Sequence, residues 1–88
     1  MSIVTVFVST SAENVGAERR FDKGITIEQL KIKLEPITGI PANTQCLSLY
    51  NGETLIGSLD GDDSVMLGAF PIENFMRLHV RYHRVILD

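Results

Sequence analysis

Cys46 and His79 are the residues whose chemistry could be joined into a nucleophilic site. Both fall in runs that are expected to form neighbouring strands, and a nearby cation lowers the pKa of a thiol. A thiol nucleophile also needs an oriented base and donors for the oxyanion, and no loop or carboxylate of the sequence can be assigned these roles. We therefore expect Cys46 to be a partly exposed structural cysteine and the chain to have no catalytic residue.

The loop that contains Asp60, Asp62 and Asp63 has the residue types that bind calcium. Counting from Asp60, the twelfth position is Pro71, where an EF-hand requires a bidentate Glu. The segment is therefore predicted to be a solvated acidic loop, and we expect neither a metal ion nor a cofactor.

The composition is that of one small globular domain. The chain has 88 residues, 44% of them apolar and 22% charged, so it can bury one core and lies outside the range of disordered sequences. Its net charge of −3 argues against a nucleic-acid partner, and no apolar run approaches the roughly 20 residues that cross a bilayer. Cys46 is the only cysteine, which is typical of a reducing compartment, so we expect a cytosolic protein without a membrane partner.

Alternating apolar residues predict strands in both halves of the chain. Residues 3–9 alternate with period two, residues 17–21 form a second extended run that can pair back on the first, and residues 45–50 alternate again. A turn at Asn51-Gly52 and a short strand near Leu55 follow, and a last strand begins near residue 76. The apolar side chains expected on the buried face are Val4, Val6, Val8, Leu47, Leu49, Met76, Leu78 and Val80.

The segment ITIEQL predicts the start of a helix. Thr26 can cap it, and Gln29 can complete a capping box. Pro36 is expected to loosen or kink the last turn, and Gly39 followed by Pro41 indicates the end of the helix. Its apolar stripe is expected to comprise Ile27, Leu30, Leu34 and Ile37. Its solvent side is expected to carry two weak ion pairs, Glu28 with Lys31 and Lys31 with Glu35.

These elements occur in the order strand, strand, helix, strand, short strand, corner, strand. One helix can cover only one face of a sheet. The predicted fold class is therefore α+β: a β-grasp with a mixed four- to five-stranded sheet and one main helix packed on one face.

The sequence resembles ubiquitin-like domains over most of its length. The strand VTVFVST, the helix start TIEQLK and the GIP after the helix have ubiquitin-like spacing, as do Leu67, Phe70 and Ile72 in LGAFPI, where the aromatic ring is expected to anchor a corner. The LGAFPI corner and the RLHV strand, preceded by LSLYN, are similar to the amino-terminal ubiquitin-like domain of the tubulin-folding cofactor B family. The resemblance implies a ubiquitin-like domain over residues 1–84 and a tail or the start of a linker over 85–88.

That resemblance implies a non-catalytic interaction domain of a chaperone for alpha-tubulin folding and for assembly and disassembly of the tubulin dimer. The implied partners, reached through a longer parent protein, are alpha-tubulin and other tubulin-folding cofactors such as cofactor E, in the cytoplasm and at the cytoskeleton. The isolated domain is expected to be a monomer. No CAP-Gly sequence is present, and the chain ends RYHRVILD rather than Gly-Gly, so a conjugated modifier is not expected.

Partner binding is expected on the sheet face opposite the helix. The resemblance places Ser48, a small polar residue, at the centre of the surface that ubiquitin uses, which disfavours generic ubiquitin receptors. An adaptor that docks on ubiquitin-binding or proteasomal receptors stays open as an alternative function, and an ordinary solvated sheet face as an alternative to any site. The candidate protein-binding residues are Phe7, Ser48, Tyr50, Arg77, His79 and Arg81, with Cys46 on the same face.

Overall fold

The computed structural model describes residues 2–12 and 16–83, so the tail predicted for 85–88 lies outside the described residues. The described chain contains five strands, one α-helix and two short 3₁₀ helices. They are β1 (Ile3–Thr10), β2 (Ala17–Asp22), α1 (Ile27–Thr38), η1 (Ala42–Thr44), β3 (Gln45–Asn51), β4 (Thr54–Ser58), η2 (Leu67–Ala69) and β5 (Arg77–Tyr82).

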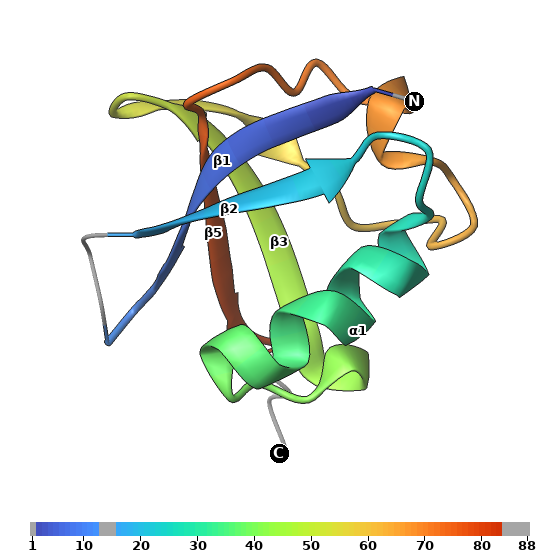
Figure 1. Ribbon diagram of the computed structural model, residues 1–88. Helices are drawn as coiled ribbons and strands as arrows, with labels where there is room; N and C mark the ends of the chain where they lie inside the picture. Colours follow the sequence, from blue (N-terminus) through green and yellow to red (C-terminus); the bar gives the residue numbers. More distant parts are fainter. Residues whose placement is uncertain (1, 13–15, 84–88) are drawn as a thin grey trace.

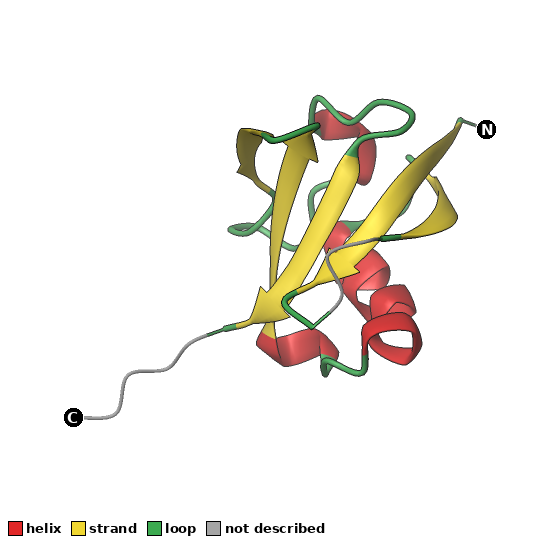
Figure 2. Cartoon of the chain, turned by 90° about the vertical axis from the view of Figure 1, so that its left-hand side faces the viewer, coloured by secondary structure: helices red, strands yellow, loops and turns green. Residues whose placement is uncertain are grey.

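The five strands form one mixed sheet in the order β2-β1-β5-β3-β4. β1 and β5 run parallel at the centre, and the other neighbours pair antiparallel. The helix α1 lies against one face of this sheet (Figures 1 and 2). The predicted α+β fold class, a mixed sheet with one helix on one face, is confirmed.

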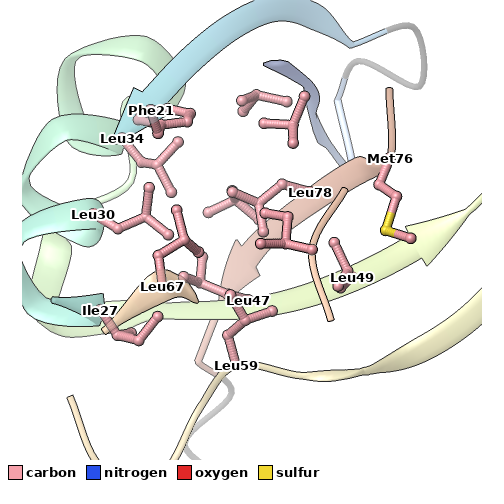
Figure 3. Close-up of a cluster of buried hydrophobic side chains, with 14 of the residues drawn as sticks. Phe21, Ile27, Leu30, Leu34, Leu47, Leu49, Leu59, Leu67, Met76 and Leu78 are labelled. Atoms are coloured by element: carbon pink, nitrogen blue, oxygen red, sulfur yellow. The ribbon is translucent and has the colours of Figure 1, made fainter. Parts of the chain in front are cut away.

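The inner face of the sheet carries the core, as the alternating pattern predicts. Each of the eight apolar strand residues expected on this face is buried. In Figure 3 side chains of α1 point toward those of the central strands, for example Leu30 and Leu34 toward Leu78. Because a strand turns successive side chains to opposite faces, burying these residues forces their neighbours onto the other side of the sheet.

The capping residues that the sequence predicts set both ends of α1. The Thr26 hydroxyl accepts a hydrogen bond from the amide of Gln29, and the Gln29 side chain accepts one from the Thr26 amide, at 3.2 and 2.9 Å. Gly39 ends the helix with a left-handed φ of 75°, and its amide donates to the carbonyl of Glu35. The helix continues past Pro36 to Thr38. Both predicted termini are confirmed.

The long connection from β4 to β5 is held against the start of α1. The amides of Ile27 and Glu28, which have no partner within the helix, donate to the carbonyls of Val65 and Asp63 at 2.9 Å. In the corner that follows, Leu67 and Ile72 are fully buried, while the aromatic ring between them, Phe70, is partly buried against the core. The apolar corner is therefore anchored mainly by its two aliphatic residues.

The prediction that Lys31 pairs on the helix surface with Glu28 and Glu35 is wrong. The Lys31 side chain is only 11% exposed, and its ammonium lies 3.4 Å from the Asp60 carboxylate and 3.2 Å from that of Asp63. Spacing along the helix could not reveal these partners, because they belong to a loop about thirty residues away that folds across the helix.

Replacing Lys31 by alanine tests this arrangement. We expect Lys31→Ala to lower the free energy of unfolding by about 1–2 kcal/mol, because two carboxylates lose their shared cation in a partly desolvated place. Lys33→Ala, which removes an exposed lysine from the same helix, should change the free energy of unfolding by less than about 0.5 kcal/mol. Urea titrations of both variants measure the difference, and equal stabilities would contradict the structural role of Lys31.

Candidate protein-interaction face

The six predicted binding residues lie together on the face of the sheet opposite α1, which we call the outer face. The strand register forms two rows across β1, β5 and β3. In the first row Arg77 stands between Phe7 and Tyr50, and in the second His79 stands between Ser9 and Ser48. Arg81 follows on β5, opposite Cys46. The structure thus confirms the shared face, and binding by it stays a prediction.

A buried hydroxyl that sequence reasoning missed lies at the centre of the outer face. Ser9 is only 1% exposed, although it follows Phe7 by two positions in β1 and so points to the same side. Its hydroxyl lies 2.9 Å from Nδ1 of His79 and accepts a hydrogen bond from the Arg77 guanidinium at 3.2 Å. Because the hydroxyl oxygen accepts from Arg77, its proton is available to donate to an unprotonated Nδ1. The only sign in the sequence that Ser9 belongs to this face is its place in the alternating pattern of the first strand.

Tyr50 holds the other side of this network. The Arg77 guanidinium carbon lies 4.3 Å from the centre of the Tyr50 ring, within the range of a cation–π contact. The His79 ring meets the same tyrosine edge-on, with 6.3 Å between ring centres. Arg77 is therefore held between an aromatic face and a hydroxyl, so less side-chain entropy would be lost when a partner contacts it.

The positive charge of the outer face comes from its arginines. Burial lowers the pKa of His79 below its ordinary value, and the charges of Arg77 and Arg81 lower it further. The imidazole is therefore mainly neutral at neutral pH, and acidic groups of a partner would meet Arg77 and Arg81.

A second missed residue, Phe75, lies beside Phe7 just before β5. The two rings are tilted, with 6.3 Å between their centres, and Phe75 is 65% exposed. Among residues 2–12 and 16–83, Phe75 is the only non-glycine residue with a positive φ, which is 70°. Its position in a loop, outside any periodic pattern, left no signal in the sequence.

The hypothetical pair of Cys46 and His79 is not formed. Cys46 Sγ lies 3.4 Å from Nδ1 of His83, while His79 contacts Ser9 and Tyr50. Cys46 and His83 line an open polar depression of about 630 Å³ together with Arg81 and the ion pair of Lys31. This arrangement places the imidazole of His83, not that of His79, near the thiol.

The acidic loop has a structural role that the prediction of a solvated loop did not include. Asp60 accepts hydrogen bonds from the amide of Leu47 and pairs with Lys31, and Asp63 pairs with Lys31 as well. Asp62 is exposed, and its pKa is lowered by hydrogen bonds from Ser64.

In the ranges 2–12 and 16–83, no group of three or more His, Cys, Asp or Glu side chains could hold a metal ion. Nor does any helix there have the length and apolar character needed to cross a membrane.

Comparison with known proteins agrees with this architecture. A family model described as a ubiquitin-like domain matches residues 3–84. Tubulin-folding cofactor B is 34% identical over 80 residues in Mus musculus and 33% identical over 81 residues in Bos taurus. Each match covers 91% of this chain but only 33% of the relative, so the chain spans about a third of the length of these curated relatives.

A solved structure of a single domain is similar to nearly the whole chain. The N-terminal ubiquitin-like domain from tubulin-binding cofactor B of Drosophila melanogaster is 32% identical to this chain, with a TM-score of 0.79. The match covers 93% of this chain and 86% of that one. The resemblance read from the LGAFPI corner and the RLHV strand is therefore confirmed.

The environment of His79 predicts a pH dependence. Because its folded-state pKa lies below the ordinary value of about 6.5, the unfolded chain binds a proton first as the pH falls. The stability that neutral His79 contributes is present above about pH 6.5 and is lost as the pH falls through the folded-state pKa. We expect His79→Gln to flatten the fall in free energy of unfolding between about pH 7.5 and about pH 5.5.

Proton NMR titration of the imidazole gives an independent measurement. Arg81→Gln should raise the pKa of His79, because it removes one of the two neighbouring charges that oppose protonation. A His79 pKa above its ordinary value in the unaltered chain would contradict this account of the outer face.

Proposed function

The chain belongs to the ubiquitin-like domain family, and on this premise we propose that it is a non-catalytic interaction domain of a tubulin-folding cofactor of the B type. In this proposal the outer face positions a longer chaperone against alpha-tubulin or against a further tubulin-folding cofactor such as cofactor E. The parent protein would act in the folding of alpha-tubulin and in assembly and disassembly of the tubulin dimer, in the cytoplasm and at the cytoskeleton. The domain itself would extend over residues 1–84 and be a monomer.

The similarity to cofactor B supports the choice of partner. Identity of 32–34% extends over nearly the whole chain, both to full-length relatives and to a solved domain. The family-model match over residues 3–84 includes the corner and the last strand, where Arg77, His79 and Arg81 are found.

The observation that carries the proposal is the chemistry of the outer face. In a chain with a net charge of −3, this face presents Arg77 between the rings of Phe7 and Tyr50, and Arg81 further along β5. Arginine and aromatic residues are enriched in protein interfaces, and complementary charge directs the encounter of partners. Ser48 gives the centre of the face a small polar side chain, which favours an acidic protein surface over the apolar partners of an aliphatic patch.

The non-catalytic role is supported by the surroundings of Cys46. The pair that it forms with His83 is exposed to solvent, where β3 begins and β5 ends, whereas a reactive thiol pair is usually held in a desolvated pocket. If Cys46 reacted with iodoacetamide much faster than free cysteine at neutral pH, a catalytic role would have to be reconsidered.

Charge reversal on the outer face tests the proposed function. We expect Arg81→Glu to weaken binding of purified αβ-tubulin about tenfold and to reduce the salt dependence of binding, because a rim charge contributes to steering. The matched control, Lys33→Glu on the solvent side of α1, should bind like the unaltered chain. Biolayer interferometry at two salt concentrations measures both.

A pull-down with the longer parent protein gives the complementary result. Removal of this domain should reduce both the recovery of tubulin and the disassembly of the dimer. Equal recovery and equal disassembly activity with and without the domain would overturn the proposal. Saturable binding of a ubiquitin-interacting helix, with NMR shifts centred on Ser48 and His79, would favour the adaptor function instead.

A further inference from the structure

Phe75 occupies a place that folding stability does not explain. Its backbone adopts a φ of 70°, a region that is strained for a bulky L-residue and that Gly or Asn enters more easily. Its ring is 65% exposed, so little apolar burial offsets this strain. A large aromatic side chain is thus kept in a backbone position that favours small residues.

The fold imposes this backbone geometry. The amide of Phe75 donates to the carbonyl of Thr5 at 2.7 Å, and the amide of Thr5 donates to the Asn74 side chain at 2.9 Å. One residue later, the amide of Phe7 donates to the carbonyl of Met76, where the pairing of β1 with β5 begins. The loop before β5 is therefore fixed to β1, and the Phe75 ring lies next to Phe7.

Two arginines and one carboxylate lie next to the two rings. The register places Arg77 beside Phe7, and Arg20 of β2 opposite Thr5, with its side chain on the face away from the buried Phe21. Glu18 faces Phe7 from the edge strand β2. On the other side Glu73 and Lys23 line one small depression, so beside the rings themselves two arginines stand against one carboxylate.

We propose that Phe7 and Phe75 form an anchor for one apolar side chain of an acidic segment in a partner protein, whose carboxylates meet Arg77 and Arg20. This inference rests on the proposed function, because it specifies how the outer face would engage a partner. Exposed aromatic rings that lose water on binding are frequent sources of binding energy, and the arginines select acidic neighbours of the anchored residue. Phe75 is the residue that carries the site, since stability alone would favour Asn or Gly there.

Short peptides with the whole chain test the anchor directly. The probes are acetylated and amidated peptides of sequence EEFEE, EEAEE and KKFKK, titrated into ¹⁵N-labelled protein. EEFEE should shift the amide signals of Thr5, Phe75 and Arg77 and should bind about tenfold more tightly than either of the other two. Equal binding of EEFEE and EEAEE, or shifts confined to other residues, would overturn the proposal.

Phe75→Asn separates binding from folding. Asn tolerates the left-handed backbone, so the variant should keep its melting temperature while its affinity for EEFEE falls about tenfold. The matched control is Ile32→Gln, which removes an exposed apolar side chain from α1, away from the outer face, and should leave the affinity unchanged. Unaltered affinity in folded Phe75→Asn would overturn the role of the ring.

The two proposals can fail separately. If αβ-tubulin binding responds to Arg81→Glu but not to Phe75→Asn, the anchor is wrong and the proposed function stands. If EEFEE binds at Phe75 while αβ-tubulin does not bind the chain, the anchor stands and its partner is a different acidic protein.

Discussion

Burial of one face of the sheet under a single helix is the constraint on which the rest of the molecule depends. α1 covers the inner face, where the apolar strand residues form one continuous core with Leu30 and Leu34 (Figure 3). Because side chains alternate along a strand, each buried residue fixes the orientation of its neighbours toward solvent. The outer face is thus a consequence of the core, and its two rows of residues inherit the rigidity of β1, β3 and β5.

That outer face is not a set of independent exposed side chains. Ser9 joins His79 and Arg77, and Tyr50 contacts both of them, so four side chains from three strands restrain one another. Burial and the charges of Arg77 and Arg81 lower the pKa of His79, and the contacts with Ser9 and Tyr50 hold Arg77 in a defined orientation. Phe7 extends the same surface to Phe75, where an exposed ring is held by hydrogen bonds of the backbone. Preorganised charge next to exposed apolar surface is suited to binding without large loss of entropy.

Around the helix α1, polar groups serve the structure. The loop after β4 supplies carbonyls to the first amides of α1 and carboxylates to Lys31. The buried Gln45 donates its amide hydrogens to the carbonyls of Lys31 and Ile40, which ties β3 to the helix and to the segment after it. Acidic residues that resembled a metal loop in isolation are therefore accounted for largely by contacts within the fold.

Local patterns were sufficient for the fold and for the shared face of the six candidate residues. The alternation of Val4, Val6 and Val8 and the capping box at Thr26 act over a few residues, so the sequence by itself determined the strands, the helix and its termini. The partners of Lys31 and Cys46, the burial of Ser9 and the backbone of Phe75 were decided only by the tertiary structure. Each of these features depends on strand register or on the path of a loop, which bring together segments far apart in the chain. Register and loop path leave no periodic signal in the sequence.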